Sequence, residues 1–380
     1  MNYRNRFPQT ILVLGGYAES LLNFRGALLK EMVALGYRVI ACAPESDRGV
    51  EGKLRGMGVE YYSVPFSRGG LNPLGDVPGI WALAKILLRV TPDFILSYTI
   101  KPVIYGSLMA GLFRIKHIFS MVTGLGYAFT PGRSLKRRII GKLATVLYRL
   151  ALHFNQGVFF QNPDDRDFFQ GRRILNPRNR VFLINGSGVD LDHFCESPLP
   201  SPSFLLIARL IGDKGIREYV QAARILKKKY KNLCFFLVGW MDKDNPDGII
   251  AKELEAWVGE GNIEYLGALS DVRPAIQNTA IYVLPSYREG TPRTVLEAMA
   301  MGRPIITTDA PGCRETVVNG ENGYLVPVRD GMALAGAMER FLSCPSLIES
   351  MGQKSRRMAE KKYDVRKVNA SILKGMGLDD

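Results

Sequence analysis

Two glutamates eight positions apart are the residues of this chain best suited to chemistry. Glu289 follows an apolar stretch that ends at Leu284, and Glu297 falls in the second turn of an expected helix that begins near Pro292. Carboxylates accept hydrogen bonds from hydroxyl groups, so the pair suits a ligand such as a sugar or a ribose. From this spacing alone, two solvated acids at the start of a helix are an equally good interpretation.

The neighbouring residues offer groups that bind an anion. Gly290 and Thr291 lie at the amino end of the expected helix, where backbone N–H groups and the helix dipole favour an anionic ligand such as a sugar phosphate. Arg209 and Lys214 follow the first apolar stretch of the second half of the chain. Two fixed cations there can clamp a diphosphate and neutralise the negative charge that accumulates on it as a sugar departs.

These residues require a scaffold of strands and helices. Short apolar runs alternate with helical patterns, which predicts an α/β protein with doubly wound parallel sheets. The strands expected in the first half are 11–14, 39–43, 94–97, 118–122, 158–161 and 181–184. Those expected in the second half are 204–208, 234–238, 263–266, 281–284 and 304–307. Ligands of such sheets bind outside the carboxyl ends of the strands, so we expect the site in a cleft between two domains.

The length of 380 residues suits two domains. The proline-serine stretch Ser197–Ser203 is typical of a linker. We therefore predict a first domain at 1–196, a second at 197–360 and a C-terminal helix at 361–380 that crosses back to the first domain.

The ordered motifs resemble a known family. The chain is similar to the retaining glycosyltransferases of family 4, which have the GT-B fold, in the following residues: Arg209, Lys214, Gly239, the Leu266–Gly267 turn before Asp271, and Glu289 with Glu297. The resemblance implies two Rossmann-like domains that face each other across a cleft. It also implies transfer of a sugar from a nucleotide diphosphate, with retention of the anomeric configuration.

The resemblance assigns roles on the donor side. Glu297 would bind the ribose hydroxyls, and Glu289 would hold the transferred sugar together with the Gly290 and Thr291 amides. Arg209, Lys214 and Glu289 would be the catalytic residues. The full set of implied donor-binding residues is Gly15, Gly16, Arg209, Lys214, Gly239, Glu289, Gly290, Thr291, Val295, Leu296 and Glu297.

Motifs of the first half narrow the resemblance. The segments 66–73, 99–102 and 122–126 are similar to transferases that extend undecaprenyl-diphosphate-linked sugars in O-antigen, capsule or protein-glycan assembly. Within that group the likeness favours N-acetylgalactosaminyltransferases that act on diacetylbacillosaminyl lipids. The partners implied are a UDP-sugar donor and a polyprenyl-diphosphate-linked acceptor. The implied acceptor-side residues are Asn23, Phe24, Arg25, Lys101, Thr123 and Gly124.

Neither a metal nor a cofactor is expected. The five cysteines are far apart, and His117, His153 and His193 lack the spacing of metal ligands. Arg209 and Lys214 would stabilise the leaving group in place of a divalent ion. Many members of the family carry a histidine after the strand that corresponds to 118–122, and this chain does not, so no role of that histidine is carried over.

The basic charge is concentrated in the first half. Residues 1–196 hold 25 Lys and Arg against 14 Asp and Glu, within a chain of net charge +14. Residues 135–154 combine five basic residues with apolar ones at helical spacing, including Ile139, Leu143, Val146 and Leu150. This apolar stripe suits either packing on the sheet or an anionic membrane surface. With no leader and no spanning segment, we expect a cytoplasmic protein, peripheral at the inner face of the cytoplasmic membrane.

Parts of the sequence suggest three other functions. A nicotinamide oxidoreductase is disfavoured because Gly15–Ser20 lacks the G-x-G-x-x-G spacing. A UDP-sugar epimerase with the same two-domain fold stays open, and a lipid-free assay would separate it from a transferase. A nucleic-acid-binding protein would use the basic half, but no helix-turn-helix, zinc-finger or aromatic platform accompanies the charge, so we expect no nucleic acid partner.

Overall fold

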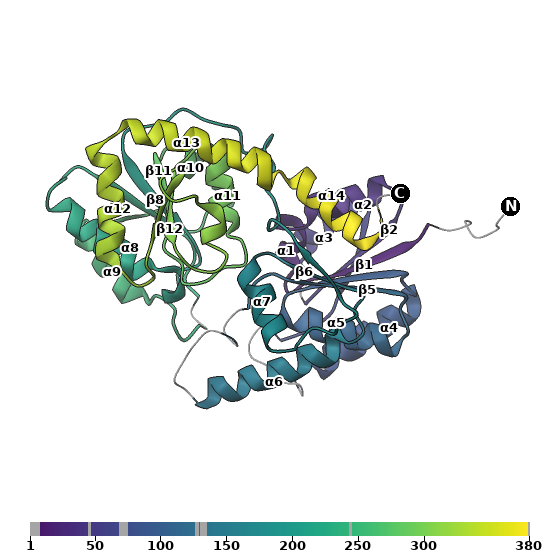
Figure 1. Ribbon diagram of the computed structural model, residues 1–380. Helices are drawn as coiled ribbons and strands as arrows, with labels where there is room; N and C mark the ends of the chain where they lie inside the picture. The colour runs from purple at the N-terminus through teal and green to yellow at the C-terminus, as the bar shows by residue number, and fades with distance from the viewer. Residues whose placement is uncertain are drawn as a thin grey trace. The chain divides into compact units, whose positions relative to one another are not determined.

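The computed structural model describes residues 8–44, 47–67, 75–125, 129, 135–242 and 245–378, the side chains of 135–138 excepted. The chain divides into two compact units. The first unit contains Met1–Ser187 and Val368–Asp380, and the second contains Gly188–Lys367. Each unit contains its own parallel sheet (Figure 1).

The described part of the first unit forms a seven-stranded parallel sheet of order β3-β2-β1-β4-β5-β6-β7. Its central strands are mostly apolar and fully buried, as expected for a parallel sheet that is covered on both faces. The strands are β1 (Thr10–Leu14), β2 (Arg38–Ala43), β3 (Val59–Ser63), β4 (Phe94–Tyr98), β5 (His117–Val122), β6 (Gly157–Phe160) and β7 (Arg180–Leu183).

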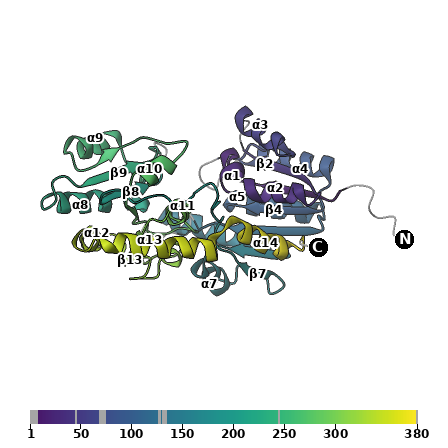
Figure 2. The same ribbon diagram turned by 90° about the horizontal axis from the view of Figure 1, so that it is seen from above.

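Helices cover both faces of this sheet (Figures 1 and 2). One face packs against α1 (Ala18–Asn23), α2 (Gly26–Ala34), α3 (Arg48–Gly56) and the C-terminal α14 (Val365–Met376). The opposite face packs against α4 (Val77–Val90), α5 (Ile100–Leu112), α6 (Leu135–Leu152) and α7 (Pro163–Gly171). Each face buries its own hydrophobic core, and this two-sided burial is the main stabilising term of such a unit.

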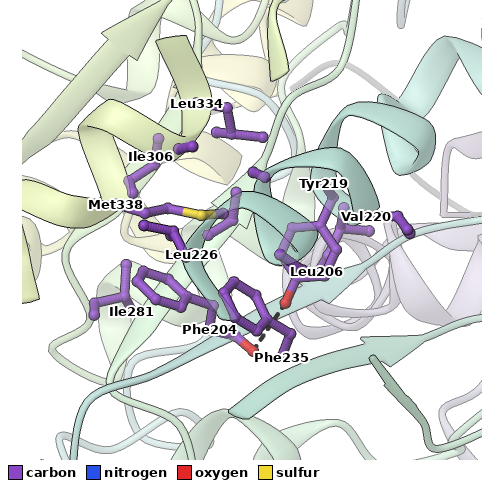
Figure 3. Close-up of a cluster of buried hydrophobic side chains, with 14 of the residues drawn as sticks. Phe204, Leu206, Tyr219, Val220, Leu226, Phe235, Ile281, Ile306, Leu334 and Met338 are labelled. Carbon is purple, nitrogen blue, oxygen red and sulfur yellow. Dashed lines mark hydrogen bonds between the residues drawn. The ribbon is translucent and has the colours of Figure 1, made fainter. Parts of the chain in front are cut away.

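The second unit repeats this architecture with a six-stranded parallel sheet of order β10-β9-β8-β11-β12-β13, as far as the described residues show. The strands are β8 (Ser203–Ile207), β9 (Cys234–Val238), β10 (Glu264–Tyr265), β11 (Ile281–Leu284), β12 (Ile305–Thr308) and β13 (Gly323–Val326). Figure 3 shows part of its core, where Phe204 stacks on Phe235 and the Tyr219 hydroxyl donates a hydrogen bond of 2.9 Å to the Phe204 carbonyl oxygen.

The helices of the second unit again lie on two faces. The core around Phe204 receives α8 (Ile216–Lys227), α9 (Ala251–Gly259), α12 (Gly331–Ser343) and α13 (Ser346–Met358). The other core receives α10 (Arg273–Gln277), α11 (Arg293–Ala300) and the π-helical turn Ala359–Tyr363. Two short 3-10 helices, Gly212–Lys214 and Arg314–Thr316, complete the unit.

The predicted fold class, two Rossmann-like parallel-sheet domains, is confirmed, and every expected strand overlaps a strand of the structure. The apolar pattern did not indicate β3 and β13, which are edge strands. β3 is only half-buried and carries polar residues among its apolar ones, so it lacks the continuous apolar run of a central strand. β13 is a short run that begins at a glycine.

The chain passes to the second unit at Ser187/Gly188, ahead of the proline-serine stretch. Arg303 explains why that stretch stays with the second unit. This buried guanidinium donates hydrogen bonds to the carbonyl oxygens of Ser197 (2.8 Å) and Pro198 (3.0 Å). At the other end of the chain, Val368 and Ile372 of α14 pack into the core of the first unit. Among the described residues, we find no helix that has both the length and the apolar character required to span a bilayer.

Candidate active site

Two loops of the second unit meet at the carboxyl edge of its sheet. The Lys214 loop, residues 208–215, follows β8, and the Glu289 loop, residues 285–292, follows β11. These strands are parallel neighbours, so their carboxyl ends lie side by side. The Lys214 ammonium forms an ion pair with the Glu289 carboxylate. One predicted cation and one predicted carboxylate therefore come together.

Backbone contacts fix the two loops to each other. Gly215 has φ = 71°, and a Cβ atom at this position would overlap the carbonyl oxygen of Pro285. The Tyr287 N–H donates a hydrogen bond of 2.9 Å to the Asp213 carbonyl oxygen. The position of Lys214 is thus set by close backbone packing as well as by its ion pair.

Gly215 is therefore expected to be essential for this geometry. Gly215→Ala should lower transferase activity and destabilise the second unit by roughly 1–3 kcal/mol, since both strain and overlap oppose the added methyl group. Gly261→Ala is the matched control, because Gly261 has φ = 70° and nothing lies within 4 Å of its Cβ position. Thermal unfolding and initial rates of both variants test this. Equal effects of the two substitutions would show that backbone strain alone, and not the packing of the loops, matters.

Glu297 lies where the sequence predicted, in the second turn of α11, which begins at Arg293 after the N-cap residue Pro292. Its side chain is buried, and its Oε1 atom lies 2.7 Å from Arg293 Nε. Burial raises the pKa of Glu297, the ion pair with Arg293 opposes this shift, and the charge of Asp271 adds to it. A buried carboxylate with one cationic neighbour can accept hydrogen bonds from ligand hydroxyl groups.

Arg209 is placed at the end of β8 but has a carboxylate partner that the sequence analysis missed. Its Nη1 atom lies 3.0 Å from Oδ2 of Asp242, which follows β9. The guanidinium is partly exposed, so an incoming phosphate would compete with Asp242 for it. Arg293 was also missed, although its spacing of four residues from Glu297 on a helix could have revealed it.

The other predicted donor-side residues of the second unit are placed as follows. Gly290 and Thr291 precede the amino end of α11. The N–H of Gly239 donates to the Gly267 carbonyl oxygen at 2.9 Å, so this amide has an internal acceptor. Val295 and Leu296 are fully buried in the core, and their N–H groups donate to the Pro292 carbonyl oxygen. The predicted donor-binding role of these two residues stays a prediction.

In the first unit, the predicted glycines follow β1. Gly15 lies against the Tyr98 hydroxyl and Gly16 against the Thr99 hydroxyl, so side chains from the end of β4 occupy the space next to both. Thr123 and Gly124 follow β5. They are partly buried, and their predicted acceptor role stays a prediction.

Arg25 is buried near the same edge of the sheet. Its side chain is only 2% exposed, with Nη2 at 2.7 Å from the Met121 sulfur and the guanidinium above the Tyr98 ring. Burial lowers the pKa of Arg25 to about 10, and the charge of Tyr98 opposes this shift. Asn23 is exposed and Phe24 is partly buried. A substrate could reach Arg25 only if its cover moved.

Lys101 does not present its charge as predicted. Its ammonium lies 2.9 Å from Asp76 Oδ1, 2.8 Å from the Ser67 carbonyl oxygen and 2.6 Å from the Ser67 hydroxyl. These acceptors account for the three N–H groups of a lysine. An acceptor phosphate could bind Lys101 only by displacing them. No sequence pattern pointed to Asp76, because the contact joins residues that are far apart in the chain.

The Asp76 carboxylate is expected to stabilise the first unit. Both partners are buried, so Asp76→Ala should cost about 3–5 kcal/mol by leaving Lys101 uncompensated. Burial would raise the pKa of Asp76, but hydrogen bonds from Lys101, Ser67 and Tyr105 outweigh it and hold the pKa below its ordinary value. The stabilisation is therefore present at neutral pH and is lost as the pH falls below about 4.

Urea unfolding tests this prediction, with hydrogen exchange in β4 and β5 reporting on the first unit. Arg38→Ala is the matched control, because the Arg38–Glu60 pair is exposed and should contribute less than about 1 kcal/mol. If the Asp76 and Arg38 variants lost the same small amount of stability, the Asp76–Lys101 pair would not have the role we give it.

The described residues contain no group of three or more His, Cys, Asp or Glu side chains that could hold a metal ion. The chemistry that they do offer is a cation and two carboxylates at the edge of a parallel sheet. The partly exposed Arg209 lies on the same loop as Lys214, and Arg293 is paired with Glu297.

Comparison with known proteins identifies the family to which the chain belongs. A model described as "Glycosyl transferase 4-like domain" matches residues 24–186, and one described as "Glycosyl transferases group 1" matches residues 201–344. The N,N'-diacetylbacillosaminyl-diphospho-undecaprenol alpha-1,3-N-acetylgalactosaminyltransferase of Campylobacter jejuni is 31% identical over 338 residues, which cover 85% of this chain and 86% of that protein. The chain belongs to the GT-B glycosyltransferases of family 4. The resemblance inferred from its motifs is confirmed.

Other known proteins match a smaller part of this glycosyltransferase or match it at lower identity. The capsular polysaccharide biosynthesis glycosyltransferase CapM of Staphylococcus aureus is 31% identical over 157 residues, 41% of each chain. Among solved structures, a sucrose-phosphate synthase from Thermosynechococcus elongatus has a TM-score of 0.78 at 17% identity, covering 96% of this chain and 98% of that one. HepE from Anabaena in complex with UDP-glucose has a TM-score of 0.75 at 18% identity, covering 97% and 99%. These structural likenesses support the GT-B fold.

Proposed function

We propose that this glycosyltransferase moves a hexose or an N-acetylhexosamine from a UDP-sugar to an undecaprenyl-diphosphate-linked saccharide, with retention. UDP-GalNAc and UDP-GlcNAc are the favoured donors. The observation that carries the proposal is the Lys214–Glu289 ion pair where β8 and β11 end, with Glu297 buried in the helix that follows. The name of the Campylobacter jejuni relative supports an acceptor of this class, used in bacterial surface polysaccharide or glycan biosynthesis.

The proposed reaction is a displacement on one face of the sugar. The acceptor hydroxyl attacks the anomeric carbon, and the new carbon–oxygen bond forms as the bond to the diphosphate breaks. The electrons of the broken bond leave with the diphosphate, and one of its oxygens takes the hydroxyl proton. No protein base takes part, and no metal is required.

Four side chains of the second unit would support this reaction. Lys214 and Arg209 would neutralise the charge on the leaving diphosphate, Arg209 exchanging Asp242 for a phosphate oxygen. Glu289 would then be released from Lys214 to accept a hydrogen bond from a hydroxyl of the transferred sugar. Glu297 would accept the hydrogen bonds of the ribose hydroxyls.

A lipid-linked acceptor would determine where in the cell the enzyme acts. The enzyme would meet this substrate at the surface of the cytoplasmic membrane, so it would be a peripheral protein of the inner face. The excess of basic residues in the first half of the chain supports this.

The decisive assay offers the purified protein a panel of UDP- and GDP-sugars with an undecaprenyl-diphosphate monosaccharide. We expect UDP release and a product that is heavier by one sugar and keeps the anomeric configuration of the donor. A product of inverted configuration would overturn the retaining mechanism. Conversion of a UDP-sugar without any lipid acceptor would instead identify an epimerase.

A further inference from the structure

The outer surfaces of α4 and α6 expose apolar side chains in ordered rows. Nine of the eleven bulky apolar side chains described as exposed in the first unit lie between Val77 and Phe154. We use the term apolar face for the following exposed residues: Val77, Trp81 and Leu88 of α4, and Ile139, Leu143, Val146 and Leu150 of α6.

The row on α6 does not pack on the sheet. Leu143 is 38% exposed and Leu150 is 54% exposed, whereas Ala144 and Tyr148, on the opposite side of the same helix, are buried in the core. The helix is therefore apolar on two sides. This result removes one of the two interpretations that the sequence left open for the row, namely that it covers the sheet.

The row on α4 points in the same direction. Trp81 and Leu88 are 63% and 64% exposed, and the residues opposite them, Leu83 and Leu87, enter the same core as α6 does. Since both helices bury their inner sides in one core, their outer sides face away from the same side of the sheet. Figure 1 shows α4, α5 and α6 together on that side of the first unit.

The two helices that carry the apolar face contain basic residues and no acidic ones. The sequence contains no Asp or Glu between Asp93 and Asp164, and the residues of α4, α5 and α6 include none. α6 has five Lys and Arg in its sequence, and the ammonium of Lys85 lies 3.2 Å from the centre of the Trp81 ring. α7, which covers the same side of the sheet, does contain aspartates, and on the other side α1, α2 and α3 each contain a glutamate.

We propose that the apolar face is the surface by which the first unit docks on an anionic lipid bilayer. Apolar rows would enter the boundary between headgroups and acyl chains, and the lysines and arginines would stay among the anionic headgroups. A tryptophan beside a lysine suits that boundary, because its ring is apolar and its N–H is polar. A second copy of this chain is a poorer occupant, since two faces without acids would place like charges opposite one another.

This inference rests on the proposed function in one respect: a lipid-linked acceptor would bring the enzyme to a bilayer. Binding to a bilayer can be tested without any sugar substrate. The full chain is mixed with vesicles of phosphatidylcholine alone or with phosphatidylglycerol added, and bound protein is separated by flotation. We expect binding to the anionic vesicles, weakened by high salt, and little binding to the neutral ones.

Substitutions locate the surface. The triple variant Leu143→Gln, Val146→Gln, Leu150→Gln should bind anionic vesicles roughly tenfold more weakly or worse. The matched control replaces exposed apolar residues elsewhere, Leu35→Gln with Val258→Gln, and should bind like the wild type. Circular dichroism of both variants excludes unfolding as the cause.

A charge pair and a fluorescence signal complete the test. Lys142→Gln should weaken binding about fivefold, and Lys30→Gln on α2 should not. Vesicles should shift the tryptophan emission to the blue in the wild type, and Trp81→Phe should abolish most of that shift.

Three outcomes would overturn the proposal. They are failure of the wild type to bind anionic vesicles, equal binding by the triple variant, and self-association of the wild type that the triple variant abolishes while vesicle binding stays unchanged. Transfer to a short, water-soluble acceptor analogue should be the same in the triple variant and the wild type. A dead enzyme that still binds vesicles would refute the proposed function and leave the docking surface intact.

Discussion

Lys214→Ala is expected to reduce kcat about 100- to 1,000-fold while the fold stays intact. Removing one preorganised group that stabilises transition-state charge typically has an effect of this size. The loop that carries Lys214 is held by close backbone packing at Gly215, so the ammonium is positioned before the diphosphate begins to leave. Steady-state kinetics with saturating donor measures the effect, because the stabilisation is needed in the transition state rather than for binding.

A second lysine–glutamate pair in the same unit provides the control. Lys229 lies 2.7 Å from Glu339, and both are on the surface. Lys229→Ala removes the same type of interaction and should leave kcat unchanged. The melting temperature of each variant separates lost chemistry from lost stability. A Lys214 variant that turned over at nearly the normal rate would refute the assignment of the leaving-group cation.

Glu297→Gln is expected to raise the KM for the donor about 10- to 100-fold, with a smaller change in kcat. A carboxylate that accepts hydrogen bonds from two ribose hydroxyls contributes more to binding than a neutral amide does, because hydrogen bonds to charged groups are the stronger ones. Glu297 is buried at the second turn of α11, so water cannot easily replace the lost acceptor. Isothermal titration with UDP measures the loss without chemistry.

The pH dependence gives this prediction a distinct signature. Because burial raises the pKa of Glu297, protonation should weaken donor binding at a higher pH than for an exposed glutamate, whose pKa is about 4.3. In the wild type, affinity for UDP should therefore fall as the pH decreases through the raised pKa, and Glu297→Gln should not show this fall. Glu253→Gln, which removes another glutamate paired with an arginine, is the control. Identical pH profiles for Glu297→Gln and the wild type would argue against a ribose contact.

Much of the donor site could be predicted from the sequence because it is built from local units. A parallel strand, its following loop and the start of the next helix are close in the chain, and adjacent strands place such loops side by side. Lys214 and Glu289 each follow a strand that the apolar pattern identified, so their meeting follows from the fold class. Arg209 is also at a predicted strand end, but its partner Asp242 belongs to the loop after another strand, where no pattern marked it.

Contacts between distant parts of the chain could not be predicted in this way. Lys101 has the charge that an acceptor phosphate would need, and only the structure shows that Asp76 and Ser67 already occupy it. The same holds for Arg25, whose burial depends on Tyr98 and Met121 from two other strands. The type of a residue determines which ligands its side chain can bind, whereas the neighbouring residues determine whether the side chain is accessible to a ligand.

The sequence by itself determined two parallel-sheet units and the carboxylates and cations at the strand ends of the second, because these follow from periodicity and from chain order. The tertiary structure alone decided which side of α6 meets water. A helical row of apolar residues indicates that one side avoids solvent, but Ala144 and Tyr148 on the opposite side already fill the space against the sheet. Only one side of a helix can pack on one core, so Leu143, Val146 and Leu150 are left exposed on the surface of the first unit.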